Sequence, residues 1–172
     1  MIDPNLKDEF GGIDENIKTA VYNFDSAGLI TTGSCEGHAD KSSPVPWIHV
    51  VAKDEPSVSA GTEEATKWKK KNEELRAKID TVIEEFYNDR NVPEDLRVAT
   101  LSGNWGFWIF CDKDAFAKWR YEVDVVVVQK EKGEPHAKHS FSESEKAERA
   151  EKLPLYYQGM DAFSEFLKKR GI

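Results

Sequence analysis

Apolar side chains recur at helical spacing in three parts of the chain. Most of them follow one another at intervals of three or four positions, so they lie along one side of a helix in each part. The pattern predicts helices over residues 14–27, 62–89 and 155–169. Their apolar positions are Ile13, Ile17, Ala20, Val21 and Phe24 in the first; Trp68, Leu75, Ile79, Val82, Ile83 and Phe86 in the second; and Tyr156, Met160, Phe163, Phe166 and Leu167 in the third.

A further helical segment is expected to begin at Ser142. Glu145 stands three residues later, and this spacing is typical of a capping box that satisfies the free amides at a helix start. Proline inside a helix removes one main-chain hydrogen bond and crowds the preceding turn. We therefore expect Pro154 to interrupt this charged segment before the last helix begins.

Short segments rich in β-branched and aromatic residues predict the strands. Residues 29–34 and 47–52 are expected to pair across a long loop, which would bring His49 opposite a residue near Ser34 or Cys35. Residues 96–101 and 105–111 predict a hairpin. After a single helical turn at 115–119, residues 121–129 contain four consecutive valines and predict a buried strand. The polar residues 131–141 predict a surface loop.

The order of these elements indicates an α+β fold. We expect two layers, in which an antiparallel sheet of about four or five strands, arranged as two helix-plus-hairpin units, is covered by helices on one face. Residues 1–12 are expected to form a flexible lead-in, and residues 13–172 a single domain.

Composition restricts the function classes. Hydrophobic residues make up 39% of the chain and charged residues 33%, so it carries enough apolar surface to fold. Its net charge of -8 repels a phosphate backbone, so we expect no nonspecific nucleic-acid binding. Two cysteines do not form a disulfide framework, and no apolar run reaches the roughly 20 residues of a membrane span. We expect a cytoplasmic protein without a membrane partner; the sequence leaves its oligomeric state open.

The strongest candidate for chemistry is the run Ser34, Cys35, Glu36, Gly37 and His38. It places a thiol, a carboxylate and an imidazole within five positions, before a proline-containing loop. Three interpretations of this turn remain open.

In the first interpretation the turn binds a metal ion. Cys35 and His38 have the Cys-x-x-His spacing of a tetrahedral site, His49 would be a third ligand, and zinc is the metal that suits such ligands. A closed site needs a fourth ligand, for which the candidates are Cys111, His136 and His139.

In the second interpretation the protein is a small hydrolase or transferase. Cys35 would be its nucleophile, His38 or His49 the base, and Glu36 the residue that orients the imidazole. In the third interpretation the turn has no chemical function: Cys35 is a small buried side chain, and Gly37 only allows the backbone to turn.

The turn also suits a small polar or anionic ligand. Backbone amides near Gly33 and Gly37, together with Ser34 and His38, would hold it, and Trp47 would complete the surface at the end of the loop. The class we favour is therefore a binding or interaction protein, with a small ligand or a protein as its partner.

Residues 31–38, Thr-Thr-Gly-Ser-Cys-Glu-Gly-His, resemble the Thr-Thr-Ser-Ser-Cys-Ser-Gly-Arg stretch of the tRNA wybutosine-synthesis methyltransferase family. The resemblance implies a similar helix-to-strand turn that presents backbone amides to a ligand. This chain has Gly33, Glu36 and His38 where that stretch has Ser, Ser and Arg.

Other features suggest further functions. The rings of Trp105, Phe107, Trp108 and Phe110 alternate along one hairpin and would offer bases a stacking platform if one face were exposed. The acidic residues suggest an inhibitor that blocks a nucleic-acid-binding partner, although most of them alternate with lysine as on a solvated helix.

Overall fold

The computed structural model describes residues 12–133 and 141–172. In this part of the chain, four strands form one antiparallel sheet: β1 (Ile30–Cys35), β2 (Trp47–Val51), β3 (Val98–Gly103) and β4 (Gly106–Cys111). The strand order is β1-β2-β4-β3, so the two predicted hairpins lie side by side through β2 and β4. The expected α+β class and the antiparallel sheet are confirmed.

The β1–β2 hairpin contains an irregularity. Thr31 lies opposite Val50, and the next pair joins Gly33 to His49, so Thr32 is an extra residue in β1. Such a bulge bends the strand and changes the direction of the side chain that it carries. His49 therefore lies opposite Gly33, the residue before Ser34, as expected for a partner near Ser34 or Cys35.

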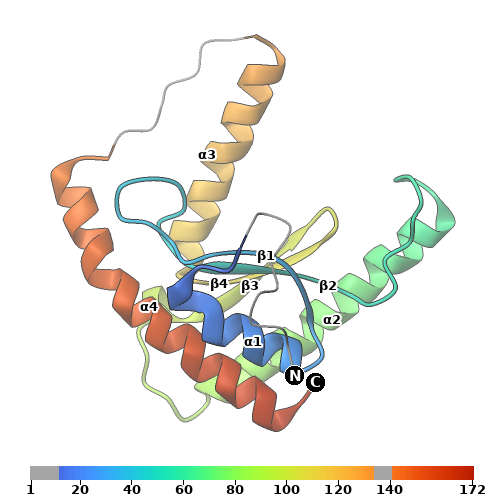
Figure 1. The fold of residues 1–172 in the computed structure, drawn as a ribbon, viewed down its shortest axis with the longest axis horizontal. Coiled ribbons are helices and arrows are strands. Elements are labelled where there is room, and N and C mark those ends of the chain that lie inside the picture. The colour runs from blue at the N-terminus through green and yellow to red at the C-terminus, as the bar shows by residue number, and fades with distance from the viewer. Residues whose placement is uncertain (1–11, 134–140) are drawn as a thin grey trace.

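Three helices cover one face of the sheet, as Figure 1 shows. They are α1 (Lys18–Ser26), which follows the 3-10 turn η1 (Glu15–Ile17), α2 (Glu63–Tyr87) and α4 (Glu143–Arg170). Thr62 caps α2 by accepting a hydrogen bond from the amide of Ala65, as its position before the apolar stripe predicts. A second 3-10 turn, η2 (Glu94–Leu96), leads into β3.

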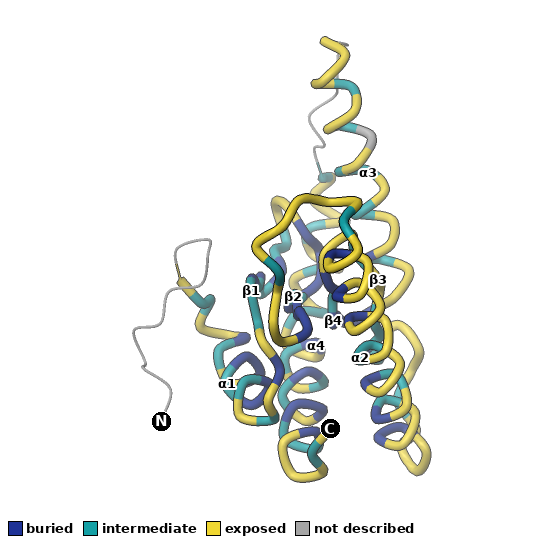
Figure 2. Tube along the Cα trace, turned by 90° about the vertical axis from the view of Figure 1, so that its right-hand side faces the viewer, coloured by how far each residue is buried: buried dark blue, intermediate teal, exposed yellow. Residues whose placement is uncertain are grey.

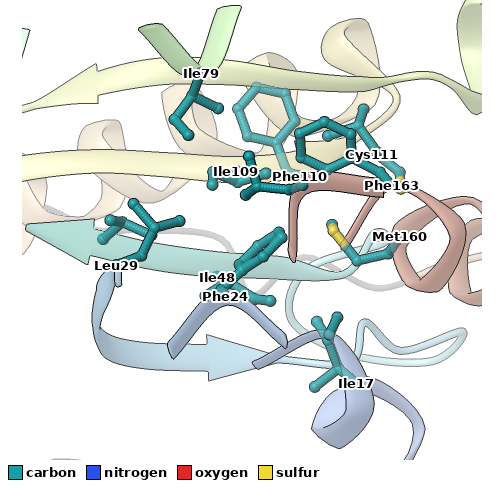
Figure 3. Packing of buried hydrophobic residues seen from close by; sticks show 14 of the residues in the cluster. Ile17, Phe24, Leu29, Ile48, Ile79, Ile109, Phe110, Cys111, Met160 and Phe163 are labelled. Atoms are coloured by element: carbon teal, nitrogen blue, oxygen red, sulfur yellow. The ribbon is translucent and has the colours of Figure 1, made fainter. Parts of the chain in front are cut away.

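The main hydrophobic core lies between these helices and the sheet (Figure 3). Ile48 and Ile109 face each other on neighbouring strands, and both are fully buried. The ring of Phe24 in α1 meets the edge of Phe163 in α4, with ring centres 6.0 Å apart. The predicted apolar stripes of the first and last helices thus pack against each other and against the sheet.

The prediction of a strand over residues 121–129 is wrong. Residues Lys113–Glu131 form one helix, α3, on the face of the sheet opposite the other helices (Figure 1). Phe116 is fully buried against the sheet, whereas Tyr121, Val127 and Val128 are exposed where the helix extends away from it (Figure 2). The side chain of Asp112 accepts a hydrogen bond from the amide of Ala115 and caps the first turn.

The prediction that Pro154 interrupts the last helical segment is also wrong. α4 continues through Pro154, and the predicted capping box of Ser142 and Glu145 stands at its start. Proline removes one main-chain hydrogen bond, but Tyr156 and Met160 are buried beyond it. Packing of these residues against the core therefore stabilises one continuous helix, although the local effect of Pro154 predicts two separate helices.

The predicted loop and lead-in fall largely outside the described residues. α3 ends at Glu131, and residues 134–140, which include His136 and His139, are not described; neither are residues 1–11. Within residues 12–133 and 141–172, none of the helices combines the length and the apolar character that crossing a bilayer requires.

Candidate functional site

The predicted turn at residues 34–38 is held by local contacts. A side chain at Gly37 would put its Cβ 2.7 Å from the carbonyl carbon of Val45. The φ of Gly37 is +81°, which favours glycine. The amide of His38 donates to the carbonyl oxygen of Ser43 at 2.8 Å. The turn therefore packs closely against its own loop.

Glu36 is bonded to the start of the first helical segment. Its Oε2 accepts hydrogen bonds from the main-chain and side-chain nitrogens of Asn16, at 3.2 and 2.9 Å. Its own amide donates to Oδ2 of Asp14 at 3.0 Å. These bonds give Glu36 a structural partner, whereas the nucleophile hypothesis needs it beside an imidazole.

Cys35 lies in surroundings that disfavour a thiolate. The side chain is buried, and its sulfur accepts a hydrogen bond from the amide of Gly37 at 3.4 Å. Burial raises the pKa of the Cys35 thiol, and the negative charges of Asp14 and Glu36 raise it further. A protonated thiol is a weak nucleophile, so the burial of Cys35 and its acidic neighbours do not favour it as the reactive group.

The predicted metal ligands that lie among the described residues do not converge. Nδ1 of His49 lies 2.6 Å from Oγ1 of Thr32, on the neighbouring strand. The other cysteine, Cys111, is fully buried and its thiol donates to the carbonyl oxygen of Tyr156. In the described ranges there is no group of three or more His, Cys, Asp or Glu side chains placed to hold a metal ion.

A cavity of about 360 Å³ lies over the face of the sheet on which α3 packs. Four of the five tryptophans of the chain line it, together with His49. The complete lining is Thr32, Trp47, His49, Val51, Glu55, Trp105, Trp108, Trp119 and Arg120. This gathering of aromatic side chains makes it the candidate functional site.

The strand register explains how the floor of the cavity forms. Side chains alternate between the two faces of a strand, so Trp47, His49 and Val51 of β2 share one face. His49 pairs with Trp108 of β4, and their ring centres are 5.2 Å apart. A side chain at Gly106 would lie 2.4 Å from the carbonyl oxygen of Val50, so the close approach of β4 requires glycine there.

Helix α3 supplies one wall. Trp119 stacks on Trp47 with ring centres 6.4 Å apart and planes inclined by 22°. The guanidinium of Arg120 lies 4.9 Å from the ring centre of Trp108 and also binds Asp124 at 3.0 Å. Cation–π contacts of this kind hold the arginine against the aromatic surface.

The outer edge of the cavity is more open. Trp105 is 39% exposed and contacts Trp68 of α2, with ring centres 5.6 Å apart. Glu55, in the segment between β2 and α2, also lies at the cavity and is exposed. Glu55 and Arg120 carry opposite charges, so the lining has no strong excess of either sign.

His49 is neutral at physiological pH. Burial lowers the pKa of its imidazole from the ordinary 6.5. A neutral imidazole has one donor nitrogen and one acceptor nitrogen, and Nδ1 is already bonded to the hydroxyl of Thr32. Nε2 is the nitrogen through which His49 can bind a ligand.

Trp119 also lines a second cavity, of about 230 Å³, between α3 and α4. There the buried Asp112 accepts a hydrogen bond from the hydroxyl of Tyr156 at 2.7 Å while it caps α3. Asp112 adopts a left-handed backbone with φ of 58°, which is uncommon for a residue other than glycine. These bonds join α3 to α4 and hold Trp119 between the two cavities.

Sequence reasoning found part of this site. Trp47 was predicted to belong to a ligand-binding surface, His49 was predicted as a metal ligand or a base, and Trp108 belongs to the hairpin considered as a stacking platform. Thr32, Trp119 and Arg120 were missed. The spacing of Phe116, Trp119 and Val123 is helical and was the signal that could have placed α3.

No protein-family model, no curated protein and no solved structure matches this chain, so the similarity to the wybutosine-synthesis family rests on residues 31–38 alone.

Proposed function

We propose that this protein binds a small ligand whose flat aromatic ring stacks on the tryptophans of the cavity. The observation that carries the proposal is that Trp47, Trp105, Trp108 and Trp119 line one cavity beside a neutral histidine. Stacking on such a ring contributes about 1–3 kcal/mol for a base-like ligand.

The polar groups of the cavity narrow the ligand class. Nε2 of His49 supplies one hydrogen-bonding position, because Nδ1 is already bonded to Thr32. A ring with a polar atom at its edge, such as a nucleobase, suits this position beside the tryptophans.

Size and charge argue against a polymer or a polyanion. The cavity volume of about 360 Å³ is at the lower end of those typical of small-molecule sites. Arg120 is paired with Asp124, and the chain as a whole carries a charge of -8. A neutral or singly charged compound therefore fits better than a nucleic acid or a nucleoside triphosphate.

Isothermal titration calorimetry of the full chain tests the proposal, with adenosine, guanosine, uridine and glucose as probes. We expect at least one nucleoside to bind and to quench tryptophan fluorescence. Trp108→Leu should weaken that binding about tenfold or more, because it removes one stacking surface.

The control is Tyr121→Ala, which removes an exposed aromatic side chain of α3 outside the cavity. It should leave the affinity unchanged. Binding of glucose without any nucleoside, or equal nucleoside affinity in Trp108→Leu and the unchanged protein, would contradict the proposal.

A further inference from the structure

The side chains of Thr32 and His49 form a hydrogen-bonded pair at the cavity. Oγ1 of Thr32 and Nδ1 of His49 are 2.6 Å apart, and both residues belong to the lining. A hydroxyl within hydrogen-bond reach of an imidazole is the arrangement from which a nucleophile is activated by a general base. This pair takes the place that the sequence assigned to Cys35 and a histidine.

The bulge in β1 sets the direction of the Thr32 side chain. Thr32 is the extra residue between two regular pairs of the ladder, so it has no partner of its own on β2. Bulges occur often beside active sites, where they turn one side chain toward the reacting group. Threonine is also restricted about χ1, so its hydroxyl is held in place.

His49 has the protonation state that a base requires. Burial lowers the pKa of the imidazole, so it is neutral near pH 7. The charged groups that line the same cavity are Glu55 and Arg120, and Arg120 is paired with Asp124. In the tautomer that carries its proton on Nε2, Nδ1 accepts the hydrogen bond of the Thr32 hydroxyl.

We propose that Thr32 and His49 cleave an ester whose aromatic ring is bound by the tryptophans of the cavity. Oγ1 of Thr32 attacks the carbonyl carbon while its proton passes to Nδ1 of His49. The ester C–O bond then breaks, the leaving alcohol takes that proton, and the acyl group remains on Thr32. The inference rests on the proposed binding function.

Water completes the reaction. Nδ1 of His49 takes one proton from a water molecule whose oxygen attacks the acyl carbon, and the bond from that carbon to Oγ1 breaks. The proton returns to Oγ1, which regenerates Thr32 and releases a carboxylic acid. The sum is ester plus water giving acid plus alcohol, without any change of oxidation state.

Hydrolysis of para-nitrophenyl acetate by the full chain tests this inference. We expect release of nitrophenol and an acetyl group on Thr32, located by mass spectrometry of peptides after acid quenching. Thr32→Val and His49→Gln should each lower the rate about 100-fold or more, the usual contribution of acid–base catalysis. Thr32→Ser should retain turnover, and Tyr121→Ala should be unchanged.

Two further measurements separate the possible outcomes. A rate that is unaffected by both Thr32→Val and His49→Gln, or that is lost in Cys35→Ser, would overturn the inference. Acetanilide, an amide of similar shape, reports binding alone by calorimetry. If acetanilide binds and the ester is not cleaved, the catalytic inference is wrong while the binding function stands. If acetanilide and the nucleosides all fail to bind, the proposed function is wrong as well.

Circular dichroism verifies that each variant is folded. If Thr32→Val does not fold, His49→Gln provides a second test of the catalytic inference.

Discussion

Replacing Phe116 by alanine tests how α3 is held on the sheet. Phe116 is fully buried, and its ring stacks on Phe110 with centres 3.9 Å apart and planes inclined by 12°. It also contacts the rings of Trp108 and Trp119, which line the cavity. Phe116 therefore anchors the helix that forms one wall of the candidate site.

The expected loss of stability follows from this burial. A buried aromatic side chain removes about 150–250 Å² from water, which at about 25 cal/mol per Å² corresponds to roughly 4–6 kcal/mol. Phe-to-Ala substitutions in protein cores cost about 3–5 kcal/mol. We therefore expect Phe116→Ala to lower the free energy of unfolding by about 4 kcal/mol, a large part of the roughly 5–15 kcal/mol that a domain has.

Urea denaturation followed by circular dichroism measures this loss. Tyr121→Ala is the matched control, because Tyr121 lies on the same helix and is 72% exposed. Its effect should stay within about 0.5 kcal/mol. If the two variants lose similar stability, Phe116 is not buried against the sheet, and the placement of α3 is refuted.

Tyr87→Phe should cost about 1–3 kcal/mol by urea denaturation, because Tyr87 accepts the hydrogen bond of the buried Val98 amide. Since burial raises the pKa of Tyr87 to about 12, its contribution to stability should be present below pH 10 and should be lost as the pH rises through 12; Tyr87→Phe should remove this alkaline dependence from Tm. The lowered pKa of His49 predicts a loss of stability in acid, because His49 takes up a proton more readily in the unfolded chain than in the folded one. Tm should therefore fall as the pH drops below 6.5, and His49→Gln should make Tm less dependent on pH in that range. Ser142→Ala should cost about 1 kcal/mol and speed hydrogen exchange of the Glu145 amide, which Ser142 caps; unchanged exchange would contradict the capping box.

Regular patterns in the sequence were sufficient for most of the fold. The stripe that includes Trp68, Ile79 and Phe86 predicted helix 62–89, and α2 spans Glu63–Tyr87. The strand-forming residues of 96–101 and 105–111 likewise placed the second hairpin, although β3 extends through Gly103. Such signals are local, because the spacing of apolar residues and the density of strand-forming residues are properties of one element.

The errors arose where distant contacts outweigh local preference. Four consecutive valines favour a strand, but Asp112 caps a helix and Phe116 anchors it by packing on β4. Packing also outweighs the local effect of Pro154, because α4 has buried residues on the C-terminal side of this proline. A run of valines does not by itself distinguish a strand from a helix, and the packing of Phe116 on β4 that anchors the helix depends on the folded sheet.

The candidate site shows the same division between local and distant signals. The polar residues at 34–38 stand together in the sequence and so suggest a site, yet a chain that reverses direction there also needs partners for its own polar groups. Glu36 and the amide of His38 find those partners in Asn16 and Ser43. The aromatic cavity has no such signal, because β1, β2, β4 and α3 each contribute one or a few residues that only the register and the docking of α3 bring together. A candidate site assembled in this way is specified by the fold, so locating it required the strand pairing of His49 with Trp108 and the position of helix α3.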